Sequence, residues 1–329
     1  MSDVPVSPMR ALVPAIEFPA ETLRLIVEYR DLLRRDGKSW ADYAAGHLRR
    51  KVEDSSFLGL LWTGPGDEAV GLAGWERAGT LGRRGFLYLA EGYQRRVVLE
   101  EFLHRLEASV PPDLPFVSWA DEVPGVSDGD RAAVFGGRGF SPAVRSDMHL
   151  PKGRDPPRPP PRPGFAPRSL TVADESLIAD LLFRAYAESP ERALFATTLD
   201  QREDARLGTH DLLHGNVGRW LPDASFGIEE GGRLIAHTLA NELEGGLITE
   251  VGVDPSFRRQ GLARQLLPAT IGALRAAGFE VPRLVVTRWN AAAVRLYKSL
   301  GFEFVPGGSG RVWLNLTALG VASAPPTEL

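Results

Sequence analysis

The sequence predicts an α/β protein of two domains in tandem. The chain has 329 residues, 43% of them hydrophobic, which is enough for two ordinary domains with a core each. Residues 151–167 are rich in proline, which has no backbone donor for a helix or sheet, so we interpret this segment as an extended connector. The halves on either side share a pattern of strands and helices. We expect a first domain over 1–150, a linker over 151–167, a second domain over 168–320 and a tail over 321–329.

Composition and charge exclude several classes of protein. A formal net charge of −4 argues against binding nucleic acid by general phosphate attraction. The chain has no cysteine, which removes disulfides, thiolate metal sites and a cysteine nucleophile. The amino-terminal segment has no apolar run behind a basic start, and no stretch approaches the ~18 apolar residues that span a bilayer. We expect a soluble, cytoplasmic protein that binds neither nucleic acid nor membrane.

The second half has a regular order of predicted elements. Apolar residues at helical spacing follow Asp174, which we expect to be the N-cap of the first helix. Gly231 and Gly232 separate two short apolar runs and predict a hairpin turn. Gly278 and Gly301 follow two later helices, as is typical of C-terminal glycines. The predicted helices cover residues 174–189, 200–217, 261–277 and 290–300, and the predicted strands cover 225–229, 234–239, 247–253 and 284–286.

The turn between the strand over 247–253 and the helix over 261–277 has the features of an anion site. The strand ends at Asp254-Pro255, a basic turn follows, and Gly261 stands at the start of the helix. A helix N-terminus leaves backbone N–H groups unpaired and carries about half a positive charge, so a phosphate can bind there. Gly261 and Ala263 let the backbone approach that phosphate closely. A tight turn that needs glycine only for its backbone angles is the alternative.

A second motif downstream consists of Asn290, Ala293, Leu296, Tyr297, Gly301 and Phe302. Together with the spacing Arg258-x-x-Gly261-x-Ala263, it resembles the acetyl-CoA motifs of the Gcn5-related N-acetyltransferases, the GNAT family. The resemblance is specific over about residues 225–305 and looser over 168–318. It implies a mixed sheet with helices on both faces and acetyl-CoA as co-substrate. The residues that it assigns to the cofactor are Val251, Gly252, Val253, Arg258, Arg259, Gln260, Gly261, Leu262, Ala263, Arg264, Asn290, Ala293 and Tyr297.

Tyr297 and Glu250 are the expected catalytic residues. Acetyl transfer to an amine needs a base for the ammonium proton and a group that protonates or stabilises the leaving thiolate. The family often has an acidic residue near Glu250, which strand alternation turns away from Val251 and Val253. A solvated strand carboxylate is the alternative. The resemblance places the phenol of Tyr297 near the thiolate, and a tyrosine that only packs is the alternative there.

Other groups complete the expected site. The backbone N–H of Val251 or Val253 would bind the thioester carbonyl, where negative charge develops. Asn290 would bind the pantetheine or cap its own helix, and the two roles are compatible. Glu242 and Glu244 are the next candidates for the base, with a charged loop as their alternative.

The first half resembles the same fold without its cofactor site. Aligning the two halves places Asp128 at Asn290, Phe135 at Tyr297, Val97 at Gly261 and Leu99 at Ala263. Branched side chains at the last two positions would fill the space that a pyrophosphate needs. We therefore expect one acetyl-CoA site per chain, in the second half.

Histidines and tryptophans in the second half suggest further roles. His210 and His214 are four residues apart on a predicted helix, the spacing of a two-histidine metal site. No acidic ligand of matching spacing accompanies them or His237, so we expect no metal, and polar surface or acceptor-pocket lining instead. Trp220 and Trp289 would shape the acceptor cleft or fill the core.

The resemblance implies direct acetyl transfer from acetyl-CoA to an amine of a small molecule or to an amino-terminal group, by a monomer or homodimer. One alternative is an acyl-CoA-binding scaffold without catalysis. Another is a different acyltransferase, for example one like the mycothiol synthases, which share the tandem arrangement. The alternating prolines and arginines of 151–167 also allow a proline-rich ligand for a partner domain.

Overall fold

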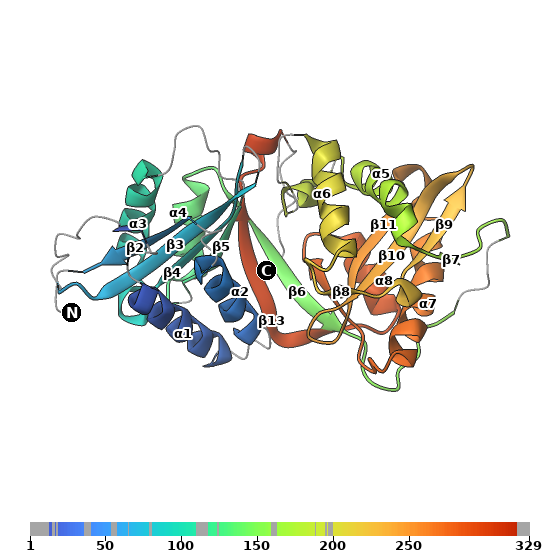
Figure 1. Cartoon of the computed structure of the whole chain (residues 1–329), viewed down its shortest axis with the longest axis horizontal. Helices are drawn as coiled ribbons and strands as arrows, with labels where there is room; N and C mark the ends of the chain where they lie inside the picture. The colour runs from blue at the N-terminus through green and yellow to red at the C-terminus, as the bar shows by residue number, and fades with distance from the viewer. Residues whose placement is uncertain are drawn as a thin grey trace. The chain divides into compact units, whose positions relative to one another are not determined.

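The computed structural model of the chain divides into two compact units (Figure 1). The first comprises Met1–Ala143 and Gly310–Ala324, and the second comprises Val144–Ser309 and Pro325–Leu329. The structure describes residues 13–14, 17, 19–35, 41–53, 58–64, 66–78, 81–109, 118–123, 125–158, 163–187, 189–194, 196 and 200–320.

The first unit is a mixed sheet with helices on both faces (Figure 1). The strands β1 to β5 lie side by side in chain order, and only the β4–β5 pair is parallel. The end of β13 (Glu303–Leu314) pairs with β5 in antiparallel orientation. The other elements are β1 (Val13–Pro14), α1 (Pro19–Arg35), α2 (Ala41–Glu53), β2 (Leu58–Thr63), β3 (Ala69–Ala78), β4 (Leu81–Leu89), η2 (Glu91–Tyr93), α3 (Arg96–Ser109), β5 (Ser118–Glu122), α4 (Asp128–Gly136) and η7 (Thr317–Leu319).

Alternation along the strands gives this sheet two apolar faces. On one face, Leu72 of β3 packs in a cluster with the buried residues of α1 and α2. On the other face, Ala73 belongs to a cluster with α3 and α4. In this second cluster Trp62 stacks on Phe102, with ring centroids 4.8 Å apart. Each face therefore has its own helical cover and its own core.

The second unit repeats this architecture with more regular elements. Its sheet has the order β6–β12–β11–β10–β9–β7, with β13 beside β6 and β8 paired to β10. The β11–β12 pair is parallel, and the other pairs from β6 to β7 are antiparallel. The elements are β6 (Ser141–His149), β7 (Arg168–Ser169), η3 (Val172–Asp174), α5 (Glu175–Tyr186), η4 (Pro190–Leu194), α6 (Gln201–Leu213), β8 (Arg219–Trp220), η5 (Pro222–Ala224), β9 (Phe226–Glu230), β10 (Arg233–Glu242), β11 (Gly246–Val253), η6 (Pro255–Phe257), α7 (Leu262–Ala276), β12 (Arg283–Thr287) and α8 (Ala291–Ser299).

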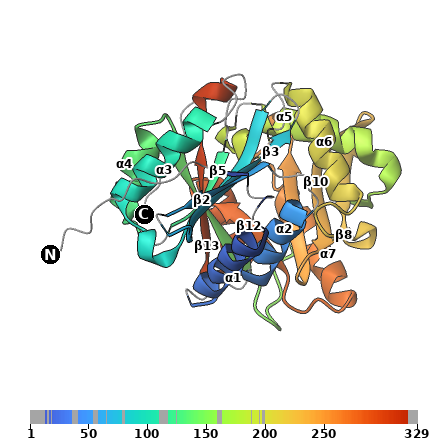
Figure 2. The ribbon, with the colours of Figure 1, turned by 60° about the vertical axis from the view of Figure 1, so that its left-hand side comes forward.

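Two helix pairs cover the faces of this second sheet. The helices α5 and α6 lie side by side (Figures 1 and 2) and pack on Leu234 and Leu239 of β10. The helices α7 and α8 cover the other face, where Ile248 and Leu284 belong to the same apolar cluster. The predicted mixed sheet with helices on both faces is confirmed.

Two strands, β6 and β13, begin in one unit and end in the other. The division falls after Ala143 within β6, so most of this strand belongs to the second unit and pairs there with β12. It falls again before Gly310 within β13, whose last residues pair with β5 of the first unit. The division between the units thus lies within two strands and not in the linker. The domain limits expected from the sequence stay a proposal.

Most predicted elements of the second half are confirmed. The turn residues Gly231 and Gly232 both have positive φ, at 57° and 76°, as the predicted hairpin requires. Asp174 occupies the N-cap position of α5, as predicted, but its side chain makes no cap bond there. Its carboxylate instead accepts hydrogen bonds from the backbone N–H of Thr171 and from Arg168, which fixes the preceding turn.

The described part of the proline-rich segment lies against the second unit. Arg275 donates hydrogen bonds to the carbonyls of Pro151 and Arg154, and Gln265 donates one to the carbonyl of Phe165. Residues 159–162 and the predicted tail 321–329 lie outside the described residues. No helix of the described chain is both long enough and apolar enough to cross a membrane.

Candidate active site

The central feature of the second unit is a gap between two parallel strands. The strands β11 and β12 pair only at Leu247 with Arg283 and at Ile248 with Leu284. Both strands continue past this point, β11 as far as Val253. Every residue of these strands is described, so the remaining backbone of β11 has no strand partner on this side. We call the gap beside this part of β11 the slot, and Val251 and Val253 line a pocket there.

A β-bulge in β11 determines which side chains face the slot. In the register with β10, Ile248 pairs with Ala240 and Glu250 pairs with Leu239, so Thr249 is an extra residue. Ile248 therefore faces α7 and α8, whereas Glu250 faces the side of α5 and α6. Without the bulge, strand alternation would have placed both on one face. As predicted, Glu250 lies on the face opposite Val251 and Val253.

The N-terminus of α7 lies at the end of this slot. Gly261 is the N-cap, with a left-handed φ of 83°, and a Cβ atom there would meet nothing within 4 Å. The first N–H groups of the helix have no intrahelical partner. The residue thus supplies both the backbone angle and the open approach that the sequence predicted for an anion.

A pocket of about 820 Å³ joins the slot to this helix end. Eleven of the thirteen predicted cofactor residues line it, namely Val251, Val253, Arg258, Arg259, Gly261, Leu262, Ala263, Arg264, Asn290, Ala293 and Tyr297. The other two do not. Gly252 is buried and faces His237, and the side chain of Gln260 donates a hydrogen bond to the carbonyl of Ser256.

Three arginines bring positive charge to the pocket, in different ways. Arg258 is held in place, donating to the carbonyls of Ala185 at 2.8 Å and Val253 at 3.4 Å. Arg264 donates to the hydroxyl of Ser299 at 2.6 Å. Arg259 has a left-handed φ of 60° and makes neither a hydrogen bond nor an ion pair with the described residues. Its guanidinium is the one of the three that remains available for a phosphate.

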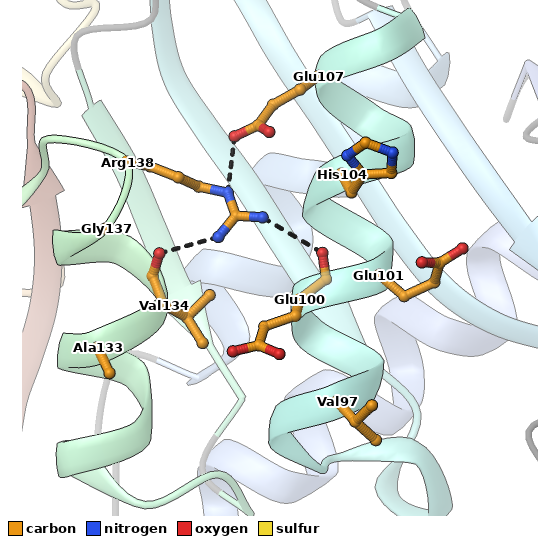
Figure 3. A pocket seen from close by; sticks show the side chains of 9 residues that line it. All are labelled: Val97, Glu100, Glu101, His104, Glu107, Ala133, Val134, Gly137 and Arg138. Atoms are coloured by element: carbon orange, nitrogen blue, oxygen red, sulfur yellow. Dashed lines mark hydrogen bonds and ion pairs between the residues drawn. The ribbon is translucent and has the colours of Figure 1, made fainter.

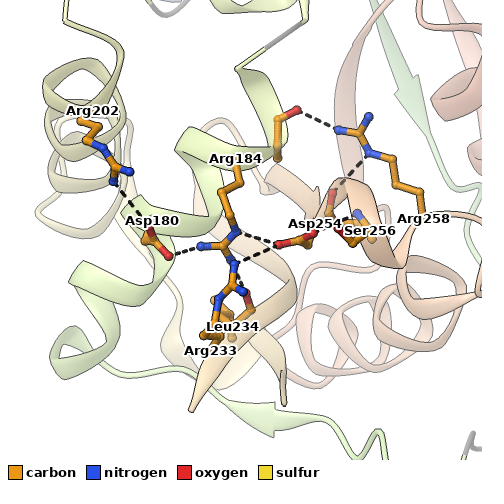
Figure 4. Close-up of polar contacts among 10 residues, drawn as sticks. Asp180, Arg184, Arg202, Arg233, Leu234, Asp254, Ser256 and Arg258 are labelled. Atoms are coloured by element: carbon orange, nitrogen blue, oxygen red, sulfur yellow. Dashed lines mark hydrogen bonds and ion pairs between the residues drawn. The ribbon is translucent and has the colours of Figure 1, made fainter. Parts of the chain in front are cut away.

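A buried network that sequence reasoning missed supports the turn before α7 (Figure 4). Arg184 of α5 donates to the carboxylate of Asp254 at 2.7 Å and to the carbonyl of Leu234 at 2.7 Å. Asp254 in turn accepts a hydrogen bond from the N–H of Ser256 at 2.9 Å. Burial acts to raise the pKa of Asp254, but the Ser256 N–H and Arg184 outweigh it, so the pKa is lowered. The Asp-Pro-Ser sequence is a signal for such a turn, but nothing in the sequence indicates Arg184.

Glu250 is a buried carboxylate with a tyrosine partner. It is 6% exposed, and its Oε1 accepts hydrogen bonds from the hydroxyl of Tyr186 at 2.9 Å and the N–H of Val251 at 3.1 Å. Burial raises the pKa of Glu250 to about 7, with these two hydrogen bonds acting in the opposite direction. The carboxylate does not itself line the pocket, but Tyr186 does. Tyr186 lies sixty-four residues before Glu250 in the chain, and sequence reasoning missed it.

Tyr297 belongs to an apolar cluster with α7 and also lines the pocket. Its ring is 6.0 Å from that of Phe302, and the residue is 8% exposed. The hydroxyl makes no hydrogen bond within the described part of the chain. Burial, and next the negative charge of Glu250, raise the pKa of Tyr297 far above its ordinary value. The phenol is therefore protonated at every physiological pH and can act as a hydrogen-bond donor.

Asn290 caps its helix, as predicted. Its Oδ1 accepts from the N–H of Ala293 at 3.1 Å, and its Nδ2 donates to Glu191 at 2.8 Å. Glu191 also lines the pocket, and sequence reasoning missed it. A role of Asn290 in holding pantetheine would require the cofactor to replace Glu191 as its partner.

The remaining candidates from the sequence lie elsewhere or have structural partners. Glu242 is paired with Arg219 at the sheet edge, and Glu244 has a left-handed φ of 50° in the turn before β11. Neither lines the pocket. Trp220 donates a hydrogen bond to Ser225, whereas Trp289 lines the pocket.

His237 is fully buried beneath the strand that lines the slot. A Cβ atom at Gly252 would come within 2.9 Å of its ring, so glycine is required there by close packing. Burial lowers the pKa of His237 to about 3, and the imidazole is neutral at physiological pH. Neither ring nitrogen has a hydrogen-bond partner in the described structure. His237 is therefore a packing residue and not part of the pocket lining.

The equivalent strands of the first unit form no slot. There β4 and β5 pair from Gly85 with Trp119 to Tyr88 with Glu122, one residue before β4 ends. The expectation for Leu99 was wrong, because this side chain is fully buried in the core and not in a groove. Val97 is 52% exposed in the first turn of α3. The continuous pairing of β4 with β5 leaves no gap at the position that corresponds to the slot. This pairing matters more than the two side chains.

The groove between α3 and α4 in this unit is acidic (Figure 3). Glu100, Glu101 and Glu107 line it together with Val97. Arg138 crosses it, donating to Glu107 at 2.8 Å and to the carbonyl of Val134 at 3.0 Å. The single guanidinium is thus engaged, and three carboxylates would repel a phosphate.

The match of α4 to α8 is only partly correct. Ser127, not Asp128, is the N-cap of α4 and accepts from the N–H of Asp130. Asp128 instead pairs with Arg311, whose Nη1 lies 2.7 Å from it. Phe135, matched to Tyr297, has no hydroxyl and stacks on Trp313 with centroids 4.6 Å apart.

Comparisons with known proteins agree with this geometry. Residues 183–302 match the model of the acetyltransferase (GNAT) family. The [ribosomal protein bS18]-alanine N-acetyltransferase of Escherichia coli K12 is 37% identical over 107 residues, which are 32% of this chain and 70% of that protein. The mycothiol acetyltransferase of Thermobispora bispora is 36% identical over 138 residues, 39% of this chain and 43% of that protein. The chain thus spans less than half the length of this relative. The chain belongs to the GNAT acetyltransferase family.

Solved structures extend the likeness of fold to nearly the whole chain. A GCN5-related N-acetyltransferase from Sphaerobacter thermophilus has a TM-score of 0.63 at 18% identity, covering 94% of this chain and 96% of its own. A tandem GNAT protein from the clavulanic acid biosynthesis pathway has a TM-score of 0.56 at 15% identity, covering 98% of this chain and all of its own. At these identities the likeness concerns the fold alone. The chain consists of two GNAT-like domains in tandem.

Proposed function

We propose that the second unit is an acetyl-CoA-dependent N-acetyltransferase. The observation that supports this most is the slot between β11 and β12, which ends at the N-terminus of α7. A strand edge without a strand partner fits the amide-bearing pantetheine arm, and the helix end fits the pyrophosphate. Gly261 leaves the cradle open, and Arg259 adds a positive charge that pairs with none of the described residues. The residues present therefore suit this co-substrate.

The thioester carbonyl would receive a hydrogen bond from β11. The N–H of Asp254 points toward β10, where it donates to the carbonyl of Ile235, so those of Val251 and Val253 point toward the slot. Glu250 already accepts from the N–H of Val251. Val253 is the donor that we propose for the carbonyl oxygen, where charge develops as the amine attacks.

Glu250 would remove the proton from the acceptor ammonium. With a pKa of about 7, this carboxylate is half ionised near neutral pH and is a stronger base than an ordinary glutamate. An α-amino group has a pKa of about 8 and an alkyl amine a pKa of about 10.4, so an α-amino proton transfers with less free-energy cost. Proton transfer through the hydroxyl of Tyr186, or through water, would connect the carboxylate to the pocket.

Tyr297 would stabilise the leaving thiolate. An ordinary thiol has a pKa of about 8.5, well below that of this buried phenol, so complete transfer of the phenolic proton is unfavourable. We therefore propose that Tyr297 donates a hydrogen bond as the carbon–sulfur bond breaks, and that the proton reaching sulfur comes from the amine.

A panel of acceptors tests this function. Purified full-length chain would be incubated with acetyl-CoA and amino acids, small peptides, aminoglycosides or alkyl amines, with release of free thiol as the readout. Relatives named for acetylation of a protein alanine and of mycothiol make amino-terminal groups and small-molecule amines the first choices. We expect acceptor-dependent thiol release that Glu250→Gln lowers. Binding of acetyl-CoA without turnover for any acceptor would instead favour an acyl-CoA-binding scaffold.

A further inference from the structure

Two histidines and a glutamate meet on the outer surface of the α5–α6 pair. His210 lies in the last turn of α6, and His214 is the C-cap residue directly after the end of this helix. Their rings stack with centroids 4.1 Å apart and an angle of 27°. Both rings direct a nitrogen at the carboxylate of Glu175, the first residue of α5. The distances are 3.1 Å from Nδ1 of His210 to Oε1 and 3.0 Å from Nε2 of His214 to Oε2.

The three groups are a suitable donor set for a transition metal. Two imidazoles and one carboxylate are ligands that Zn²⁺ takes, with water in the fourth position. Their ligand atoms all lie within 4.8 Å of one another. Metal–ligand bonds of about 2.1 Å in tetrahedral geometry hold the ligand atoms about 3.4 Å apart. The observed nitrogen–oxygen distances are close to that spacing, so small side-chain movements would admit the ion.

We propose that Glu175, His210 and His214 form a binding site for a divalent transition-metal ion of the Zn²⁺ class. The expectation of no metal rested on the missing acidic ligand, and Glu175 lies too far away in the sequence for spacing to reveal it. The proposal does not depend on the acetyltransferase activity.

The cluster is exposed enough for an ion to reach it. The side chains of His210, His214 and Glu175 are 48%, 39% and 28% exposed. Hydrogen bonds at such sites compete with water and contribute little to stability. The same exposure gives an ion free access and leaves room for coordinated water.

The ligands are held in place before any ion arrives. At the other end of the helix pair, Arg202 of α6 lies 3.7 Å from the carboxylate of Asp180 and 4.1 Å above the ring of Phe183. Leu181 of α5 and Leu213, the last residue of α6, belong to one apolar cluster. Because both helices are fixed by these contacts, little ordering is required on binding. The ion would cross-link α5 and α6 at the end remote from Tyr186.

Zinc binding by the full-length chain tests the site. The protein must carry no histidine tag, and Zn²⁺ affinity would be measured by competition with a chromophoric chelator. We expect one tight site per chain. His210→Ala, His214→Ala and Glu175→Gln should each weaken it by at least about 10-fold, since loss of a ligand costs no less than loss of a group that supports one. His104→Ala, which removes an exposed histidine of α3, is the matched control and should bind as the wild type does.

Two further measurements keep the proposal open to contradiction. Co²⁺ should give visible d–d absorption in the wild type that disappears in the His210→Ala/His214→Ala double variant. Excess Zn²⁺ should raise the melting temperature of the wild type by about 5 °C and leave that of the double variant unchanged. Circular dichroism would verify that the variants are folded, and Glu175→Gln keeps the shape of the side chain. Equal Zn²⁺ affinity of the wild type and the double variant would overturn the site and leave a hydrogen-bonded carboxylate only.

Discussion

The hydroxyl of Tyr186 donates a hydrogen bond of 2.9 Å to the carboxylate of Glu250 and joins the end of α5 to the bulged strand β11. Tyr186 lines the pocket, whereas Glu250 lies behind it. The bulge at Thr249 turns Glu250 toward α5 and makes this contact possible. The result is a buried carboxylate that Tyr186 connects to the pocket, as the proposed base requires.

The pH dependence of turnover tests the role of Glu250. Because its pKa is raised to about 7, activity should increase as the pH rises through 7 and the carboxylate loses its proton. Glu250→Gln should lower turnover at neutral pH and recover part of it at high pH, where free amine is present. The hydrogen bond from Tyr186 lowers the pKa of Glu250, so Tyr186→Phe should move the inflection to higher pH.

A control for this profile uses two acceptors whose amines have different pKa values. An inflection that belongs to Glu250 stays at the same pH with both, whereas one that belongs to the acceptor moves with it. A raised KM for the acceptor with unchanged kcat in Glu250→Gln would indicate that the carboxylate only binds the ammonium. Wild-type kinetics in this variant would remove Glu250 from the site.

Loss of the Tyr297 hydroxyl should slow the chemical step. Tyr297→Phe keeps the ring contact with Phe302 and removes only the donor, so acetyl-CoA affinity should change little. A group that assists the leaving thiolate contributes on the order of 10² to 10⁴ in rate. Single-turnover kinetics would measure this step apart from product release. A fall of less than threefold would identify Tyr297 as a packing residue.

Calorimetric titration should find one acetyl-CoA site per chain. Gly261→Val should abolish binding, because the new side chain fills the open space before α7. Gly278→Val is the matched control. Gly278 also has a positive φ, at 93°, and no neighbour within 4 Å of a Cβ, but it does not line this pocket. The control carries the same backbone strain and should bind normally. Two equivalent sites in the wild type would contradict the assignment to the second unit.

Acid stability should reflect two buried groups that act in opposite directions. The pKa of His237 falls from 6.5 to about 3, so its contribution to stability is complete above pH 6.5 and is lost as the pH falls toward 3. The pKa of Glu250 rises from 4.5 to about 7, so its contribution is complete below pH 4.5 and is lost as the pH rises through 7. Between pH 4.5 and 6.5 the two effects cancel, one proton against one.

Glu250→Gln removes one side of this balance. Relative to the wild type, its free energy of unfolding should decrease by about 1.4 kcal/mol for each pH unit lost between pH 6.5 and 4.5. Urea unfolding at a series of pH values would measure the difference. Parallel curves for the two proteins would show that Glu250 keeps an ordinary pKa in the folded state.

Local sequence patterns predicted the parts of the site that lie within one stretch of chain. Gly261 follows from the strand, turn and helix around it, and Asn290 follows from capping. Arg184, Tyr186 and Glu191 were missed because their partners are distant in the chain, and only packing brings them together. The bulge at Thr249 also has no local signal, because it is a relation between two strands. The sequence therefore predicted the helices and strands better than the contacts between them.

Because β13 passes from the second unit to the first, the first unit can complete its sheet only late in synthesis on the ribosome. The first unit pairs β5 with Val312, Trp313 and Leu314, and Phe135 stacks on that same Trp313. These residues emerge only after almost the whole second unit has been translated. Until then β5 has an open edge, and the nascent first unit is exposed to wrong pairing with other chains. A nascent chain stalled near residue 305 should therefore be more sensitive to protease in its first unit than the released protein.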